Sequence, residues 1–219
     1  ILISMIKDIT ILKQKTSGTD INSVVNSDAN YGVGFRTGSL AGKFLVASPS
    51  LQGSCFTRAV IYMCSHNESG AMGIIVNYPV ENVGIDDIME QLNIESTASR
   101  SFPVHFGGPV ENNRGFIIHS DEFSANGAIF KYDGMTVTSN ADVLLAIAKG
   151  NGPKHGLLAL GYAGWTAGQL EAEMENGGWI VVSATKQLLF DTDNEMKWGL
   201  AIASLGFDVG NFSASVGHA

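Results

Sequence analysis

Three short segments of the chain place glycines directly against apolar or aromatic residues: 70–79, 105–110 and 161–171. Glycine alone accepts a positive φ without a steric penalty, and its missing side chain lets a second backbone approach closely. We therefore expect each segment to be a tight strand end, where backbone meets either backbone or a ligand. None of the three contains a recognisable catalytic apparatus.

Short apolar runs between turn residues indicate that strands dominate the compact part of the chain. Their β-branched and aromatic content favours strands over helices. We expect strands at 43–48, 59–64, 72–77, 104–106, 115–119, 129–130, 135–138, 157–160 and 179–182. Because 157–160 and 179–182 are almost wholly apolar, both are predicted to be central strands of a layered α/β sheet.

Local signals predict the turns and helices. Residues 107–109 (GGP) cannot continue a regular ladder, and Asp133-Gly134 suits a type I′ hairpin turn. Apolar residues at i, i+3, i+4 and i+7 from Ile85 predict an amphipathic helix over one sheet face. Three later helices are predicted to begin at side chains able to cap free amides: Ser139, Thr166 and Thr192. The first should stop at Gly150.

Length and composition indicate one large domain after a polar segment. The chain has 219 residues, 45% hydrophobic and 16% charged, which is enough for a sizeable core. Residues 14–30 are polar and glycine-containing, without apolar periodicity. We expect residues 1–39 to be a partly disordered tail or linker and residues 40–219 a single domain. The apolar start, broken by Lys7 and Asp8, is too short to cross a membrane.

Charge and cysteine content restrict the class of partner. The chain carries 13 Lys and Arg against 21 Asp and Glu, a net charge of -8, so nucleic-acid phosphates would be repelled. Cys55 and Cys64 lie within or beside an apolar run and do not indicate a disulfide framework. We expect a cytoplasmic protein that binds neither a membrane nor, directly, a nucleic acid.

Known catalytic and cofactor signatures are missing from the sequence. Residues 38–43 (GSLAGK) resemble a phosphate loop but are one residue short, and Phe44 replaces the required Ser or Thr. The chain has no G-x-G-x-x-G, G-x-S-x-G, H-E-x-x-H or C-x-x-C motif. We therefore expect no cofactor.

A metal site is one interpretation of the alternating residues Cys64, His66 and Glu68, because alternate side chains of a strand share a face. A fourth ligand, such as His119 or Asp121, would have to arrive by folding. The favoured interpretation is structural: Cys64 is a core thiol, His66 caps a strand end and Glu68 is solvated in a turn. No metal is therefore predicted.

Scarce cations beside the glycine-containing segments suggest an anion site. The guanidinium groups of Arg58 and Arg114, with free backbone N–H groups at Gly107 and Gly108, would suit a phosphate or carboxylate. The alternative for each arginine is a structural ion pair with an acidic residue.

Aromatic residues near Gly161 and Gly164 allow two interpretations. Trp165, with Tyr162 and Trp179, can form a flat-walled ligand pocket. Alternatively, the glycines let a strand-to-helix turn pack under Trp165, with Thr166 capping the helix.

Eight ordered blocks resemble those of the bacterial YqgE/AlgH family, over roughly residues 40–219. The blocks are 47–51 (ASPSL), 56–60 (FTRAV), 64–67 (CSHN), 70–77 (GAMGIIVN), 106–110 (FGGPV), 114–116 (RGF), 161–165 (GYAGW) and 168–171 (GQLE). The chain departs from the family pattern at Gly53, Ser65 and Ala167, where aspartate, glutamate and proline are usual. The resemblance implies a mixed α/β (α+β) fold with a partly split mixed sheet flanked by helices and a smaller α+β portion. Family members are often labelled transcriptional regulators, through the association of AlgH with alginate control.

Three hypotheses about function follow. The leading one is a cytoplasmic, non-enzymatic binding or regulatory protein for a partner protein or small anionic ligand. Its candidate ligand-binding residues are Arg58, His66, Gly107, Gly108, Arg114, His119 and Trp165. The second is an enzyme with His66 or His119 as general base. The third is a transcriptional regulator that acts indirectly.

Overall fold

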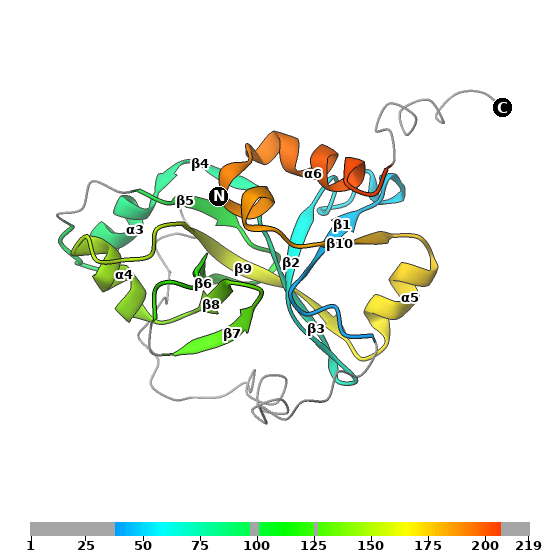
Figure 1. The fold of residues 1–219 in the computed structure, drawn as a ribbon, viewed down its shortest axis with the longest axis horizontal. Helices are drawn as coiled ribbons and strands as arrows, with labels where there is room; N and C mark the ends of the chain where they lie inside the picture. The colour runs from blue at the N-terminus through cyan, green and yellow to red at the C-terminus, as the bar shows by residue number, and fades with distance from the viewer. Residues whose placement is uncertain (1–37, 97–100, 125–126, 207–219) are drawn as a thin grey trace.

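The structure, a computed structural model, describes residues 38–96, 101–124 and 127–206 (Figure 1). The strands are β1 (Lys43–Ala47), β2 (Val60–Asn67), β3 (Gly70–Ile75), β4 (Pro79–Gly84), β5 (Pro103–Phe106), β6 (Val110–Ser120), β7 (Ala128–Tyr132), β8 (Met135–Thr138), β9 (Gly156–Thr166) and β10 (Trp179–Ser183). The helices are α3 (Ile85–Gln91), α4 (Ala141–Ala148), α5 (Gln169–Glu175) and α6 (Asn194–Ala203), with the short 3-10 helix η1 (Pro49–Leu51) and the π-helical turn η2 (Gln187–Asp191).

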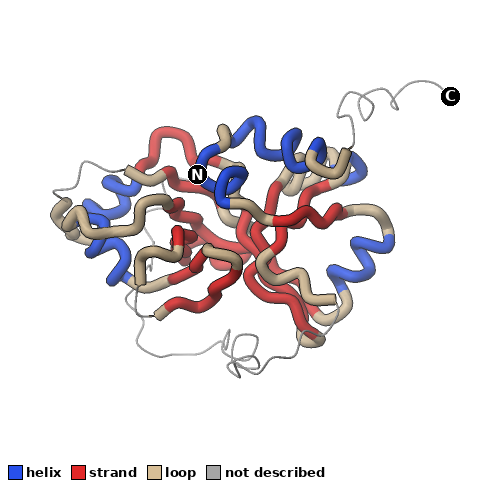
Figure 2. Tube along the Cα trace, in the orientation of Figure 1, coloured by secondary structure: helices blue, strands red, loops and turns tan. Residues whose placement is uncertain are grey.

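The described strands form one curled ten-stranded sheet, so the predicted α+β class is confirmed. The order is β10-β1-β2-β3-β9-β6-β8-β7, with β4 paired to β5 and β5 paired to β9. Among the described strand pairs, β5 and β9 are parallel and the others are antiparallel. The expected layered α/β arrangement is therefore replaced by a largely antiparallel sheet. Figure 2 shows the strands crossing in the middle of the molecule, with helices outside them.

Strand β9 is the centre of this sheet. Its first half pairs with β5 on one edge and β6 on the other, and its second half pairs with β3. The chain leaves β5 at Phe106 and resumes as β6 at Val110, which pairs with Tyr162. Because β5 and β6 lie on opposite edges of β9, residues 107–109 must cross over that strand.

Glycines make the crossing over β9 sterically feasible. A Cβ on Gly107 would lie 2.2 Å from the carbonyl oxygen of Gly161, and one on Gly108 would lie 2.1 Å from the carbonyl carbon of Tyr162. Gly161 has a φ of 75°. The expected close approach is therefore one of backbone to backbone. Gly161 and Gly164 lie within β9 and not in the strand-to-helix turn predicted from the sequence.

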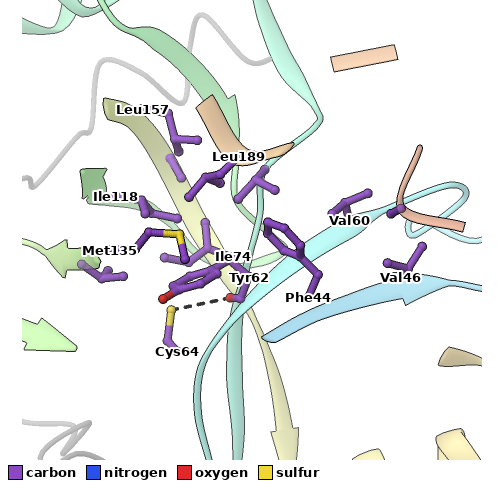
Figure 3. Close-up of a cluster of buried hydrophobic side chains, with 14 of the residues drawn as sticks. Phe44, Val46, Val60, Tyr62, Cys64, Ile74, Ile118, Met135, Leu157 and Leu189 are labelled. Atoms are coloured by element: carbon purple, nitrogen blue, oxygen red, sulfur yellow. Dashed lines mark hydrogen bonds between the residues drawn. The ribbon is translucent and has the colours of Figure 1, made fainter. Parts of the chain in front are cut away.

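Three buried clusters stabilise the two faces of the sheet. The largest, around Tyr62 and Phe44, lies under η2 and α6 and is shown in Figure 3. A second cluster packs against α3 and α4, with Ile88 and Leu144 fully buried. A third lies against α5 and contains Trp165. In Figure 1, α3 and α4 lie at the left of the molecule, α5 at the right and α6 along the top.

The structure confirms the nine predicted strands and the helix at Ile85, and corrects one strand position. The type I′ turn is supported, since Asp133 and Gly134 both have positive φ, 45° and 80°. Strand β10 lies at the edge of the sheet and not at its centre. Its apolar character has a different cause, because Trp179 faces the third cluster and Val182 the first. Strand β4 and the turn η2 were not predicted.

The predicted helix caps were wrong by one or a few residues. Helix α4 is capped by Asn140, whose side chain accepts from the Asp142 N–H, and not by Ser139. Helix α5 begins after Gly168, while Thr166 ends β9 and donates to the Gln169 side chain. Helix α6 begins after Asp193, since the Thr192 hydroxyl donates backward to the Gln187 carbonyl. Of these three helices, α4 alone has a side-chain cap, from Asn140, while the N-cap residues Gly168 of α5 and Asp193 of α6 make no side-chain cap hydrogen bond. The predicted stop after α4 is confirmed, with Gly150 at a φ of 76°.

Part of the expected domain organisation lies outside the described residues. The predicted tail or linker, 1–39, falls almost wholly in 1–37, and the end of the predicted domain falls in 207–219. Within the described ranges, no helix is long and apolar enough to span a membrane.

Candidate functional site

In the predicted anion site around residues 107, 108 and 114, the polar groups of Gly107 and Arg114 have partners within the chain. The Gly107 N–H donates to the Leu160 carbonyl at 2.7 Å, and the Gly107 carbonyl accepts from Ile75. The Arg114 guanidinium lies 3.1 Å from a Glu111 carboxylate oxygen and packs on the Phe116 ring. Arg114 is therefore in a structural ion pair with Glu111, the alternative considered for it from the sequence. Gly107 and Gly108 form the crossing over β9.

His66, in β2, makes hydrogen bonds to Glu171 of α5 and to Leu40, near the start of the described residues. Its Nε2 lies 2.7 Å from a Glu171 carboxylate oxygen, and its Nδ1 accepts from the Leu40 N–H at 3.2 Å. The imidazole thus donates on one side and accepts on the other, which leaves no free lone pair for a general base. Hydrogen bonding to its own backbone and then to His66 holds the pKa of Glu171 below its ordinary value.

His119 is fully buried at the end of β6. Its Nδ1 donates to the Ser120 carbonyl at 2.9 Å, and its ring packs edge-on against Phe123. Its Nε2 is buried without a hydrogen-bond partner in the described part of the chain. Burial lowers the pKa of His119, so the neutral imidazole is favoured. A general base needs an accessible nitrogen, and the His119 ring is fully buried.

Cys64, His66 and Glu68, the residues considered as possible metal ligands, do not form a cluster in the structure. Cys64 lies in the core beside Tyr62 (Figure 3), where burial raises the pKa of its thiol. A register shift between Met63 and Ser65 breaks the alternation that would have aligned it with His66. No group of His, Cys, Asp and Glu suited to a metal ion occurs within the described ranges.

Trp165 is a buried structural residue. Its indole N–H and that of Trp179 both donate to one carboxylate oxygen of Glu173, at 2.9 and 2.7 Å, and the two rings pack edge to face. Burial acts to raise the pKa of Glu173, but hydrogen bonds from Trp179, Trp165 and Gln169 outweigh it and hold that pKa below its ordinary value. This arrangement fastens α5 to β9 and β10, and Trp165 is only 7% exposed.

Arg58 differs from Arg114 because its guanidinium has no acidic partner among the residues that the structure describes. It is exposed, and no ion pair joins it to a carboxylate of the described residues. The guanidinium lies 5.3 Å from the centre of the Trp198 ring on α6. Its backbone takes a φ of 58°, and its carbonyl accepts from the Asn77 side chain at 2.9 Å. A non-glycine residue with positive φ is uncommon and strained, and the Asn77 hydrogen bond helps to hold it.

Beneath α6, three polar side chains that sequence reasoning missed form a buried junction: His105, Asn194 and Lys197. The Asn194 carbonyl oxygen accepts from the Lys197 amine at 2.9 Å and lies 3.1 Å from His105 Nε2, so that nitrogen carries the proton. The Lys197 amine also donates to the Val76 carbonyl at 2.8 Å. This α6 junction ties the helix to β5 and to the end of β3.

Burial shifts the pKa values of both titratable groups in the α6 junction. It lowers the pKa of Lys197 to about 8. It lowers the pKa of His105 to about 4, against the opposing hydrogen bond to Asn194. Both shifts favour the uncharged forms. A lysine at a core-facing position of α6, directly before the buried Trp198, is the sequence signal that could have identified this junction.

The outer side of α6 exposes several apolar residues, with Glu195 exposed beside them. Met196 and Leu200 are 55% and 46% exposed, and Gly199 and Ala203 lie beside them at helical spacing. We call these four residues the α6 face. Arg58 flanks the same helix through Trp198. Together, these apolar side chains and a cation that stacks on the core-facing Trp198 of the same helix, without an ion pair among the described residues, can bind a segment that carries both apolar side chains and a carboxylate.

A cavity elsewhere is too small for a metabolite. It is lined by Phe102, Ile147, Gly150, Gly152 and Pro153 and holds about 20 Å³, which is about the space of one water.

The sequence matches a family model described as AlgH-like over residues 44–210. A UPF0301 protein of Bradyrhizobium sp. (strain BTAi1) is 46% identical over 200 residues, covering 86% of this chain and 93% of that protein. A UPF0301 protein of Jannaschia sp. (strain CCS1) is 45% identical over 186 residues, covering 84% and 97%.

Two solved structures share the fold. The solution structure of AlgH from Pseudomonas aeruginosa matches with a TM-score of 0.68 and 35% identity, covering 84% of this chain and 97% of that one. The crystal structure of a Corynebacterium diphtheriae protein matches with a TM-score of 0.63 at 20% identity, covering 80% and 91%, and this match concerns the fold alone.

Proposed function

This chain belongs to the AlgH-like family, and we propose that it is a cytoplasmic, non-enzymatic binding protein that takes a partner protein's acidic, apolar segment on the α6 face. The single observation that carries the proposal is Arg58, an exposed cation without an acidic partner in the described chain, held against α6 by Trp198.

The shape and charge of this surface support a peptide segment over a small anion. Met196 and Leu200 expose apolar area that a small anion would leave uncovered. Burying that area is the main source of affinity, while one charge-assisted hydrogen bond to Arg58 adds specificity. The stacked guanidinium needs little further ordering on binding. The two free thiols are consistent with a reducing compartment.

A peptide titration tests the proposal. The probe is a synthetic amphipathic helix with leucines at i, i+3, i+4 and i+7 and glutamates between them, and binding is followed by fluorescence anisotropy. Arg58→Gln should weaken binding about tenfold, because a hydrogen bond to a charged group contributes roughly 1.5 kcal/mol. Leu200→Ser should weaken it as well.

Matched controls make the result specific. Arg114→Gln removes a cation that is already paired with Glu111, and Leu145→Ser removes a leucine on α4 that is 40% exposed, close to the 46% of Leu200. Both should bind the probe like the wild type. The proposal fails if Arg58→Gln binds equally well, or if a lysine-containing version of the peptide binds better. Competition by inorganic phosphate that is equally strong with Leu200→Ser would replace the peptide site by a simple anion site.

A further inference from the structure

The hydrogen-bond ladder between β2 and β3 changes at the end of β3, where an asparagine side chain enters it. Continuing the register of the two strands by one residue places Val60 opposite Val76. Two residues in such an antiparallel pair normally exchange both of their backbone hydrogen bonds. Here the Val76 N–H donates to the Val60 carbonyl at 2.9 Å, but the Val60 N–H donates to the side-chain oxygen of Asn77 at 2.7 Å. The Asn77 amide therefore takes the place of a backbone carbonyl.

The other half of the Asn77 amide holds the backbone of Arg58. Its nitrogen donates to the Arg58 carbonyl at 2.9 Å, so one buried side chain bonds on both sides of the residue between Arg58 and Val60. Arg58 has a φ of 58°, which is strained for a residue with a side chain. The Tyr78 hydroxyl donates to the preceding carbonyl, that of Thr57. Two successive side chains thus restrain two successive carbonyls of this loop.

The same stretch of chain also holds α6. The Val76 carbonyl, which the Val60 N–H has left, accepts from the Lys197 amine at 2.8 Å. The next residue of the helix is Trp198, whose ring carries the Arg58 guanidinium at 5.3 Å. Residues 76–78 therefore bind both the loop that carries the cation and the helix that carries its aromatic partner.

We infer that Asn77 is the positioning residue that places the Arg58 guanidinium on Trp198. The arginine side chain is long and has many rotamers, so its end is placed only if its backbone is fixed. Hydrogen bonds of the Thr57 side chain also order the loop, but they join residues 51–57 and stop short of Arg58. The consequence for binding rests on the proposed function: without Asn77 the site should lose its preference for a carboxylate.

NMR spectroscopy of the full-length protein tests this inference without any partner. The ring current of Trp198 should move the side-chain signals of Arg58 upfield, and their loss in Arg58→Gln identifies them. Asn77→Leu removes both amide hydrogen bonds without adding a charge, so the upfield shift should fall by more than half. Asn77→Asp keeps the acceptor for the Val60 N–H and removes only the donor to Arg58. It should give the same result, and it is the test variant if Asn77→Leu does not fold.

Two controls separate positioning from a general loss of stability. Leu144→Ala removes part of a fully buried side chain from the cluster under α3 and α4, and should leave the Arg58 signals in place. The Trp198 indole N–H donates to the Ala47 carbonyl at 2.7 Å. It should stay protected from hydrogen exchange in the Asn77 variants, which shows that α6 is still packed on β1.

Peptide binding adds a measurement that a purely structural role would not affect selectively. Asn77→Leu should weaken the acidic peptide about tenfold, as Arg58→Gln does, and the double variant should be no weaker, because both changes remove one interaction. A version of the peptide with glutamines in place of the glutamates should bind the wild type and Asn77→Leu equally. A general disturbance of the surface would weaken both peptides.

Each result decides between distinct conclusions. Arg58 signals that stay upfield in both Asn77 variants would overturn the inference, as would signals that move equally in Leu144→Ala. A double variant that binds about a hundredfold more weakly than the wild type would also overturn it, because Asn77 would then act independently of Arg58. If the signals move in the Asn77 variants but Arg58→Gln binds the acidic peptide like the wild type, the positioning role is supported and the proposed function is contradicted.

Discussion

Gly161 and Gly168 take nearly the same left-handed backbone conformation, with φ of 75° and 74°, in opposite surroundings. A Cβ on Gly161 would lie 2.4 Å from the Gly108 carbonyl oxygen, whereas a Cβ on Gly168 would meet no atom within 4 Å. Conformation alone therefore explains Gly168. Gly161 is required for a second reason, because another backbone crosses it.

This contrast predicts the effect of an added methyl group. Gly168→Ala should lower the free energy of unfolding by about 1 kcal/mol, the usual penalty for left-handed backbone. Gly161→Ala should lower it by a further 2 to 3 kcal/mol or so, because the crossing segment must move. Urea unfolding followed by circular dichroism measures both. If the two variants lost the same free energy of unfolding, residues 107–109 would move aside at no energetic cost. That result would contradict the close crossing.

Among the elements, α6 combines an apolar outer face with a polar junction beneath it. Lys197 occupies a core-facing position with only 3% of its surface exposed, and its amine has two neutral acceptors and no carboxylate among the described residues. Its pKa is lowered from 10.5 to about 8. Folding is therefore opposed by protonation of this amine, since the unfolded chain holds the proton more tightly than the native one.

The free energy of unfolding should accordingly gain a contribution from Lys197 that increases as the pH rises. Between pH 8 and 10.5 the unfolded state binds more protons at Lys197 than the folded state, so this contribution to the free energy of unfolding increases with pH. The total is on the order of 3 kcal/mol. Lys197→Met should remove that part of the slope in urea unfolding measured across this range.

Lys186→Met is the control for the alkaline slope. Lys186 is 46% exposed and paired with Asp121 at 2.9 Å, so its removal should keep the wild-type slope. Tyrosine titration contributes equally to all three proteins. If Lys197→Met kept the wild-type dependence of the free energy of unfolding on pH, burial would not lower the pKa of the Lys197 amine.

The whole molecule is joined by one strand. β9 contributes Leu157 and Ala159 to the cluster under α6, Leu158 and Leu160 to the cluster under α3 and α4, and Ala163 and Trp165 to the cluster under α5. Alternating residues send successive side chains to opposite faces of the sheet, so unfolding either end exposes the strand that supports the other. The prediction from the sequence of a single domain over residues 40–219 therefore implies one cooperative transition.

Tryptophan fluorescence can test this cooperativity, because Trp165, Trp179 and Trp198 lie in the clusters under α5 and α6. Leu144→Ala acts at the other end, on a fully buried side chain of α4, and should cost about 2 to 5 kcal/mol. The fluorescence and circular dichroism transitions of this variant should shift together. A fluorescence transition left at the wild-type denaturant concentration would divide the chain into two domains.

The sequence by itself determined the strands and the amphipathic helix, because apolar periodicity and turn residues act over a few positions. The family and the α+β class followed from the resemblance of ordered sequence blocks. Helix caps were misplaced by one or a few residues, since neighbouring polar residues such as Ser139 and Asn140 are equally suited to the role. The edge position of β10 could not be predicted from its apolar sequence. Such a sequence indicates that both faces of a strand are buried, and helices can cover both faces of an edge strand as they do those of a central one.

Tertiary structure alone decided which residues meet. Sequence singled out Gly107 and Gly161 but not that one crosses the other, since they are far apart along the chain and the contact depends on strand order. It also singled out Arg58 and Arg114 alike, and only the fold gave Arg114 a carboxylate while Arg58 has none within the described part of the chain. His105 and Lys197 carried no motif at all. The junction forms because β5 brings His105, and α6 brings Asn194 and Lys197, to the same buried place. Burial there lowers the pKa values of His105 and Lys197.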